Sequence, residues 1–263
     1  MDMSYTYLLL ENSEGVTTLT LNRPDKLNAL NNEMMLEIRD ALHRIKDDSA
    51  TRVLVLRGAG KAFCTGADLS GFKAEEDEME AINRRASLTM EVNAMFHKLG
   101  KPVIASVHRY ALAGGCGLAM AADMVIAADD AVFGYPEIQR GFVAALVMTN
   151  LIRLVGRRNA FDLLITGRKI DAREALKMGM VNKVVPREEL DKETMALAKE
   201  LAALSPTAAR MTKNLFYRVA EMNVNDALET ARETNILMRL TGDFKKGVDE
   251  FVNKRSRDGG EGS

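Results

Sequence analysis

The chain has no tryptophan and only two cysteines, Cys64 and Cys116, among its 263 residues. Two cysteines cannot build the disulfide framework of a small secreted protein. Because both lie in apolar or glycine-rich surroundings, we expect reduced, packed thiols. Histidine is also scarce: His43, His97 and His108 are far apart and none has a His or carboxylate partner at metal-ligand spacing. No metal site is therefore expected.

An excess of charge of one sign is also missing. Lys plus Arg number 36 and Asp plus Glu number 37, so there is no overall positive field to attract nucleic acid or an anionic membrane. No run approaches the roughly 18 to 20 apolar residues of a membrane span. The start, MDMSYTYLLL, lacks the basic region of a signal peptide. These absences predict a cytoplasmic protein with neither a nucleic-acid nor a membrane partner.

Several catalytic and nucleotide-binding motifs are absent or incomplete. No Gly-x-Ser-x-Gly elbow of a serine hydrolase occurs. The turn Gly115-Cys116-Gly117 has Met120 where a dinucleotide-binding fingerprint needs a third Gly or Ala. A second glycine turn begins at Gly58, but its spacing does not match a P-loop. The sequence therefore disfavours both nucleotide hypotheses.

Apolar periodicity predicts a mixed α/β first half and a helical second half. The first two strands flank a turn and are expected to pair as an antiparallel hairpin. The polar segment Arg255–Ser263 is expected to be disordered. The predicted strands are Tyr5–Leu10, Val16–Leu21, Val53–Leu56, Val103–Val107, Met124–Ala127, Ala131–Phe133 and Val181–Val185. One predicted helix starts at Asn31 and another at Leu118. The other predicted helices are 74–99, 145–155, 157–166, 172–178, 188–203, 206–221 and 223–240.

Two glycine turns, each following a strand expected to be parallel, carry the chemistry. One lies in the loop 58–69, and the other leads from Val103–Val107 into a helix through Gly114, Gly115 and Gly117. Free amides at such turns favour an anion or a developing oxyanion. Two of them could hold one carbonyl oxygen while a nearby carboxylate, Glu137, moves a proton at the adjacent carbon. The pattern indicates enolate chemistry.

Several segments, in order along nearly the whole chain, resemble motifs of the crotonase, or enoyl-CoA hydratase/isomerase, superfamily. They are Leu21–Pro24 with Asn28–Leu30, Lys61–Leu69, Lys101–Ala105, Tyr110–Ala119, Phe133–Ile138, and Phe251 with Lys254 and Arg255. The resemblance implies a crotonase (ClpP-like) α/β fold, with a repeated β-β-α spiral core over 1–200 and a C-terminal helical trimerisation region over 201–263. It also implies homotrimers or hexamers, and a coenzyme A thioester as substrate with no other cofactor.

The same resemblance assigns residue roles by motif position. The amides of Ala67 and Gly114 are expected to form an oxyanion hole, with Glu137 as the catalytic carboxylate. The residues expected to bind the substrate and coenzyme A are Lys26, Leu27, Ala29, Ala62, Phe63, Gly66, Asp68, Leu69 and Gly115.

One departure from the family pattern affects the choice of reaction. Gly117 stands where typical hydratases carry a first glutamate, so Glu137 is left as the single carboxylate. The resemblance favours an enoyl-CoA hydratase-like lyase, including the branched-chain methylglutaconyl-CoA type. A Δ3-Δ2-enoyl-CoA isomerase is the alternative, and a catalytically impaired or engineered coenzyme A-binding protein is another.

Three further departures lie near the expected site. Arg109 replaces a usual glycine, so a positive φ is expected there, with its guanidinium either in the acyl pocket or exposed at the surface or an interface. Ala144 replaces a usual proline. The bulky run Leu146–Met148 replaces small residues, which predicts an altered acyl pocket.

Overall fold

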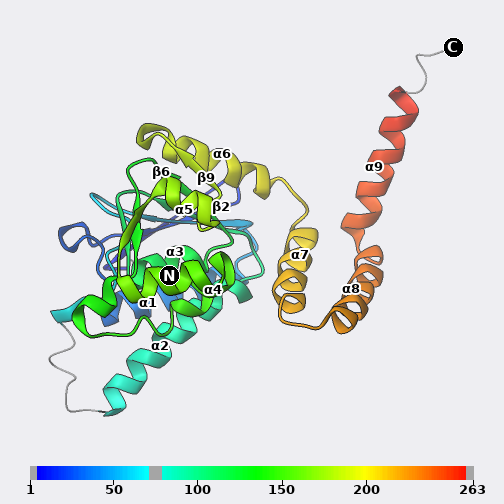
Figure 1. Ribbon diagram of the computed structural model, residues 1–263. Coiled ribbons are helices and arrows are strands. Elements are labelled where there is room, and N and C mark those ends of the chain that lie inside the picture. The colour runs from blue at the N-terminus through cyan, green and yellow to red at the C-terminus, as the bar shows by residue number, and fades with distance from the viewer. Residues whose placement is uncertain (1–4, 71–78, 259–263) are drawn as a thin grey trace. The chain divides into compact units, whose positions relative to one another are not determined.

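A computed structural model of the chain describes residues 5–70 and 79–258 (Figure 1). The chain divides into two compact units, Met1–Ala202 and Ala203–Ser263, which are described separately.

The first unit is built on a six-stranded sheet of order β1-β2-β3-β4-β6-β9. β1 and β2 pair antiparallel around a turn in which Glu14 and Gly15 have positive φ, which confirms the predicted hairpin. The pairs from β2 to β9 are parallel, and the turn-bearing strands β3 and β4 are neighbours, as expected. The strands are β1 (Leu8–Ser13), β2 (Val16–Leu21), β3 (Val53–Gly58), β4 (Val103–Val107), β6 (Met124–Ala128) and β9 (Lys183–Val185).

A second, three-stranded sheet contains β5 (Tyr110–Leu112), β7 (Val132–Gly134) and β8 (Lys169–Asp171) in the order β5-β7-β8. β4 in the large sheet is followed by β5 in the small sheet and then by a helix, and β6 and β7 repeat the step between sheets. This alternation is the expected β-β-α repeat. The sequence did not predict β5 or β8, which have three residues each.

Helices cover both faces of the large sheet (Figure 1). On one face lie α1 (Asn32–Asp47), α2 (Met79–Lys98) and α3 (Gly114–Ala121), whose apolar side chains share the main core with strand residues such as Leu54 and Val103. On the other face α6 (Leu190–Ala202) packs on a smaller cluster. The side chain of Asn31 caps α1 by accepting a hydrogen bond of 3.0 Å from the amide of Met34, as its sequence position predicts.

The two predicted helices 145–155 and 157–166 correspond to two helical segments of α4 (Met148–Thr166), which begins three residues later than expected. The segments meet at Gly156, whose φ of 75° and ψ of 166° are not helical. The glycine supplies the positive φ that separates the two segments. α5 (Ala172–Met178) follows and ends at Gly179 in the left-handed conformation. Residues 74–78 of the predicted helix 74–99 lie outside the described residues.

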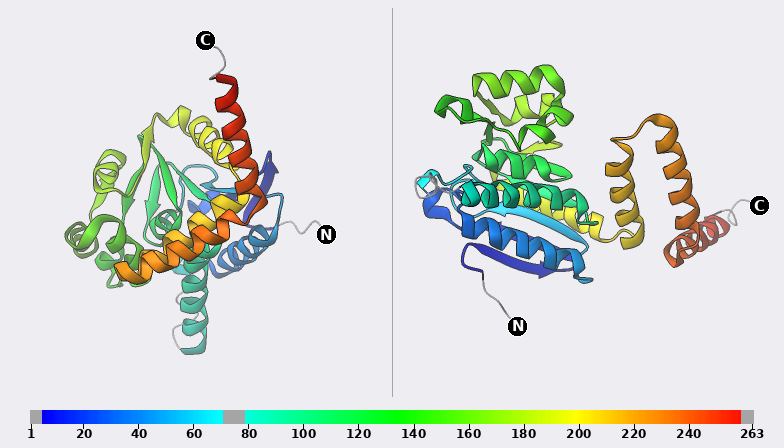
Figure 2. Two further views of the ribbon diagram at one scale, coloured as in Figure 1. Left: turned by 90° about the vertical axis from the view of Figure 1, so that its right-hand side faces the viewer. Right: turned by 90° about the horizontal axis from the view of Figure 1, so that it is seen from below.

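The second unit contains α7 (Pro206–Val219), α8 (Val224–Arg239) and α9 (Gly242–Asp258), with α7 and α8 side by side (Figure 2). The sequence did not predict α9. The expectation of disorder from Arg255 is wrong as far as Asp258, because α9 extends to that residue, and 259–263 lie outside the described part. Along the stretches that the structure describes, no helix is both long and apolar enough to cross a membrane.

Candidate active site

Two turns from distant parts of the chain meet at one end of the sheets. Leu30 bridges to Ala67 and Cys64 bridges to Ala111, so the loop after β3 pairs with β5, directly before α3. A Cβ atom on Gly66 would lie 2.7 Å from the Cβ of Ala113, so a side chain at Gly66, where φ is 92°, would push the turns apart. Ala113 itself has a φ of 50°, a strained value for a residue other than glycine.

The helix that follows the second turn starts earlier than the sequence suggested. α3 begins at Gly114, so the glycines lie inside its first turn, and β5 separates them from β4. Within the part of the chain that the structure describes, neither the Gly114 amide nor the Ala67 amide donates a backbone hydrogen bond. Both residues line the same cavities, so their amides are available to a ligand.

The larger of these cavities, of about 470 Å³, contains Glu137. Glu137 follows Pro136 at the start of a short 3-10 helix, η3 (Pro136–Arg140), and lines the same cavity as Ala67 and Gly114. Leu69, one of the residues expected to bind the substrate or coenzyme A, also lines this cavity, together with the basic side chains of Arg140 and Lys169. The structure therefore brings Ala67, Gly114, Glu137 and Leu69 together.

The carboxylate of Glu137 lies in a partly dehydrated position. Its Oε2 atom is buried and has no hydrogen-bond partner among the described residues. Burial raises the pKa of Glu137 above its ordinary value, and its own backbone amide and Arg140 oppose this only in part. A carboxylate with a raised pKa beside two free amides can exchange a proton with a group held by those amides.

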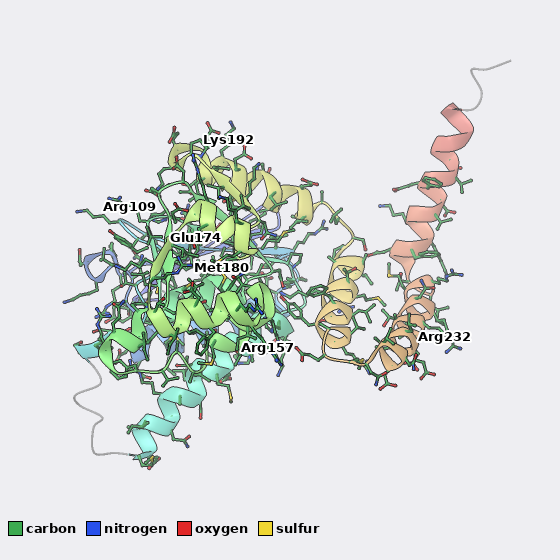
Figure 3. The ribbon with its side chains drawn as sticks, viewed as in Figure 1. Arg109, Arg157, Glu174, Met180, Lys192 and Arg232 are labelled. Atoms are coloured by element: carbon green, nitrogen blue, oxygen red, sulfur yellow. The ribbon has the colours of Figure 1, made fainter. Side chains whose placement is uncertain are left out.

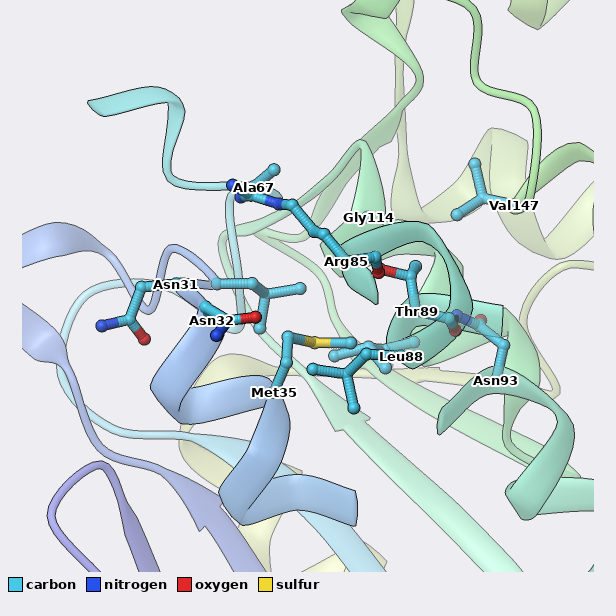
Figure 4. A pocket seen from close by; sticks show the side chains of 12 residues that line it. Asn31, Asn32, Met35, Ala67, Arg85, Leu88, Thr89, Asn93, Gly114 and Val147 are labelled. Carbon is cyan, nitrogen blue, oxygen red and sulfur yellow. Dashed lines mark hydrogen bonds between the residues drawn. The ribbon is translucent and has the colours of Figure 1, made fainter. Parts of the chain in front are cut away.

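A smaller cavity, of about 70 Å³, is also lined by Ala67 and Gly114 (Figure 4). Its apolar walls include Met35, Leu88 and Val147. Three polar side chains of α2 line it as well, namely those of Arg85, Thr89 and Asn93. The sequence interpretation missed them because it followed only the apolar side of α2, where Ile82 was expected to be packed but is 46% exposed. Their spacing of four residues is the signal that could have found them.

The remaining predicted ligand residues lie around these cavities without lining either of them. Ala62 and Phe63 are fully buried. Gly115 packs against Cys64, since a Cβ there would lie 2.3 Å from the Cys64 carbonyl oxygen. The structure thus gives Gly115 a role in the close approach of the two turns.

Four other residues that were predicted to bind the substrate or coenzyme A lie nearer the surface, beside the glycine turn of the loop 58–69. Lys26 is exposed, Leu27 has a φ of 50°, and Ala29 accepts a hydrogen bond from Arg23 through its carbonyl. Asp68 forms an ion pair with Arg23, with Nη1 and Oδ2 2.6 Å apart. The hydroxyl of Ser70 and then Arg23 lower the pKa of Asp68 to about 2.

The side chain of Val147, from the bulky run Leu146–Met148, packs against Gly117. A Cβ on Gly117 would lie 2.2 Å from Cγ1 and 2.9 Å from Cβ of Val147. Val147 is buried and lines the smaller cavity, so at least this member of the run Leu146–Met148 shapes that cavity, as predicted. Ala144 is buried but lines a separate apolar groove along α4.

Arg109 has the positive φ that its position predicts, 51°, but its side chain does not reach the candidate site. It is 57% exposed at the periphery of the first unit (Figure 3), and its Nε lies 3.9 Å from Oδ2 of Asp130. The hypothesis of a guanidinium in the acyl pocket is therefore wrong, because the turn from β4 to β5 points this side chain outward. The surface alternative is the one that fits.

The cysteines are free, as expected. Cys64 and Cys116 are fully buried, and burial raises the pKa of each to about 12, so neither is a reactive thiolate. Among the described residues, no cluster of His, Cys, Asp or Glu could hold a metal ion.

Comparison with known proteins identifies the family. Residues 11–259 match the Enoyl-CoA hydratase/isomerase family. The chain is 38% identical to the crotonyl-CoA hydratase of Syntrophomonas wolfei over 96% of this chain and 97% of that one. It is 36% identical to the short-chain-enoyl-CoA hydratase of Clostridium acetobutylicum over 98% of each chain. A crystal structure of an enoyl-CoA hydratase from Mycobacterium smegmatis superimposes with a TM-score of 0.91 at 35% identity, covering 94% of this chain and 96% of that one. The chain therefore belongs to the enoyl-CoA hydratase/isomerase family, and the prediction of a crotonase fold is confirmed.

Proposed function

We propose that this protein is an enoyl-CoA hydratase-like lyase that acts on a coenzyme A thioester and needs no further cofactor. The observation that carries the proposal is the convergence of two unpaired amides, those of Ala67 and Gly114, with the buried carboxylate of Glu137 in one cavity. The names of the hydratases to which the chain is similar support this choice of reaction.

In the proposed mechanism the two amides form an oxyanion hole. They donate hydrogen bonds to the thioester oxygen, which becomes negative when a nucleophile adds at C3 of the enoyl group. Glu137 removes a proton from water, the resulting hydroxide bonds to C3, and the C2–C3 π electrons move onto the thioester as an enolate. The enolate collapses when Glu137 returns the proton to C2. One carboxylate thus serves as base and then as acid, and the elements of water are added without a net charge change.

The coenzyme A moiety is proposed to run along the surface side of the first turn. Lys26 and Leu27 are exposed there, and Ala29 and Asp68 lie beside them. Leu69 continues this line into the larger cavity, while buried Ala62 and Phe63 and the glycines Gly66 and Gly115 support the backbone that the ligand follows.

The test of the mechanism is the substitution Glu137→Gln, which keeps the shape of the side chain but removes its basicity. The rate of crotonyl-CoA hydration, measured as the loss of the conjugated enoyl absorbance, is expected to fall about 10²- to 10⁴-fold. Binding of coenzyme A is expected to be retained. Glu189→Gln, an exposed carboxylate paired with Lys192, is the matched control and leaves the rate unchanged. Retained activity of Glu137→Gln contradicts the assignment.

Isomerisation between Δ3- and Δ2-enoyl thioesters is the second candidate, because Glu137 is the one carboxylate lining the larger cavity among the described residues and Gly117 stands where typical hydratases carry a first glutamate. In that reaction Glu137 takes a proton from C2 and returns it to C4. A Δ3-enoyl-CoA substrate separates the candidates, since isomerisation creates the conjugated absorbance and hydration of a Δ2-enoyl-CoA removes it. Acceptance of branched acyl chains, as in the methylglutaconyl-CoA type, is tested with the same assay.

A homotrimer, or a hexamer of two trimers, is the proposed assembly. The second unit exposes more large apolar side chains than a solvated helical surface needs, which is typical of an association surface. Light scattering is expected to give three or six times the 29.0 kDa chain mass, and a monomer contradicts the proposal. The apolar side chains of this unit that are at least half exposed are Leu204, Phe216, Val224, Leu228, Leu237, Leu240, Phe251 and Val252.

A further inference from the structure

The smaller cavity beside the two amides has a polar side that an unsubstituted hydrocarbon chain does not require. Arg85, Thr89 and Asn93 lie four residues apart on α2, so they form one stripe along the helix and all three line the cavity. Asn31 and Asn32, at the start of α1, add further polar groups to the lining.

Two members of the stripe are fixed by hydrogen bonds to their own helix. The hydroxyl of Thr89 donates to the Arg85 carbonyl at 3.0 Å, and Nδ2 of Asn93 donates to the Thr89 carbonyl at 2.8 Å. The other amide atom of Asn93, Oδ1, is buried and accepts no hydrogen bond from any described residue. Leaving a buried acceptor unpaired costs about 1 to 3 kcal/mol, so the site favours an occupant that brings hydrogen-bonding groups.

Arg85 gives the cavity its charge. Its half-buried side chain lines the cavity and extends from α2 toward Ala67 (Figure 4). None of the described residues lining this cavity is acidic. A guanidinium beside apolar walls such as Leu88 and Leu118 binds a carboxylate more strongly than it would in open solvent, because the pair is less screened by water and the planar groups match.

The size of the cavity limits what can follow the thioester. At about 70 Å³ it has room for only a few non-hydrogen atoms. Since Ala67 and Gly114 line both cavities, an acyl group held by their amides and reacting beside Glu137 can place its far end here. The far end of the acyl group must therefore be short and compact. A terminal carboxylate on an acyl chain of about five carbons meets this condition.

From this we infer that the substrate is a short acyl thioester with a second, terminal carboxylate, which Arg85 binds in the smaller cavity. The inference rests on the proposed function and specifies its substrate class. Asn93 can also contribute through a bridging water molecule. Its unpaired Oδ1 atom can accept a hydrogen bond from a water molecule that donates its other hydrogen bond to the carboxylate. Arg85 is then a substrate-binding residue that selects the acyl group, while Glu137 carries the chemistry.

The test compares two substrates that differ only at the far end, glutaconyl-CoA with a terminal carboxylate and 2-pentenoyl-CoA with a terminal methyl group. The protein is expected to hydrate glutaconyl-CoA with a kcat/KM at least 10-fold higher. Arg85→Gln is expected to remove that preference and to change the rate with 2-pentenoyl-CoA less than 3-fold, while Arg85→Lys keeps part of it. Arg84→Gln is the matched control, because Arg84 is 63% exposed and paired with Glu80.

Equal kcat/KM values for the two substrates, or an equal loss for both in Arg85→Gln, would overturn the inference. Binding of the saturated analogues glutaryl-CoA and pentanoyl-CoA, measured by calorimetry, separates failure of the carboxylate site from failure of the proposed function. If neither enoyl thioester is hydrated but glutaryl-CoA binds at least 10-fold more tightly in a manner that depends on Arg85, the reaction is wrong and the carboxylate site stands. If the analogues bind equally, the carboxylate site is refuted whatever the reaction.

Discussion

The contact between Gly117 and Val147 makes a quantitative prediction about stability. In Gly117→Ala the new methyl carbon would lie 2.2 Å from Cγ1 of Val147, well inside van der Waals contact. Overpacking of this kind costs about 1 to 3 kcal/mol. Alanine in place of glycine within α3 returns about 1 kcal/mol through helix propensity. The net expected effect is a loss of up to about 2 kcal/mol from the free energy of unfolding.

Truncating Val147 should relieve the closer contact, with Cγ1, while the contact of 2.9 Å with the Cβ of residue 147 remains. Val147→Ala alone deletes two buried methyl groups and is expected to cost about 1.6 kcal/mol, at about 0.8 kcal/mol for each group. The double variant should be about 1 to 2 kcal/mol more stable than the sum of the single effects, because residues in contact are coupled. The measurement is urea unfolding at 25 °C and at one fixed protein concentration, since association affects apparent stability.

Gly247→Ala in α9 is the control for helix propensity, because a Cβ at Gly247 meets nothing within 4 Å. That substitution is expected to stabilise its helix by about 1 kcal/mol. If Gly117→Ala stabilises the protein to the same extent, or if the Gly117 and Val147 effects simply add, then Val147 moves aside freely. The reasoning that Val147 closes the space above Gly117 would then be refuted.

Three other predictions concern the turns and the carboxylates. Gly66→Ala is expected to lower kcat at least 10-fold, because its methyl group would separate the two amide-bearing turns, and an unchanged kcat would contradict this. The pKa of Glu137 is raised, so kcat/KM should fall as pH drops through an apparent pKa above 4.5, and the folded state should lose stability as pH rises from 4.5 to that pKa. Glu137→Gln should therefore raise Tm at pH 8 but not at pH 4, as checked by calorimetry. Asp68, with its pKa lowered to about 2, stabilises the fold above pH 3.8 and loses this effect toward pH 2, so Asp68→Asn should cost about 1 kcal/mol at pH 7 and almost nothing at pH 2.

The elements with a clear apolar period could be predicted from the sequence. The strands Val16–Leu21 and Val103–Val107 have the expected bounds, and the start of α1 at Asn31 was predicted from a capping residue followed by apolar residues at helical spacing. The short strands β5 and β8 were not predicted, because their strand conformation depends on hydrogen bonds with β7, which is distant in sequence from both. α9 was missed for a related reason: several of its apolar residues, such as Phe251 and Val252, are exposed in the single chain and form no buried stripe.

The candidate site was predicted in part. Motif position indicated Glu137, Ala67 and Gly114, and the structure places them around one cavity. The direction of the Arg109 side chain was not readable, because it depends on how the chain turns between the two sheets. Arg85 was missed because a charged residue on an amphipathic helix is normally solvated, and only the tertiary structure brings it against the cavity.

The meeting of Gly66 with Ala113 has a consequence for the order of folding. The two amides belong to segments nearly fifty residues apart in the chain, and neither turn has the other's support until the bridges Leu30 to Ala67 and Cys64 to Ala111 form. Contacts of such sequence separation form slowly because the intervening loop must be closed first. Far-ultraviolet dichroism should therefore recover before enzymatic activity during refolding, and the lag between them measures the docking of one repeat on the next.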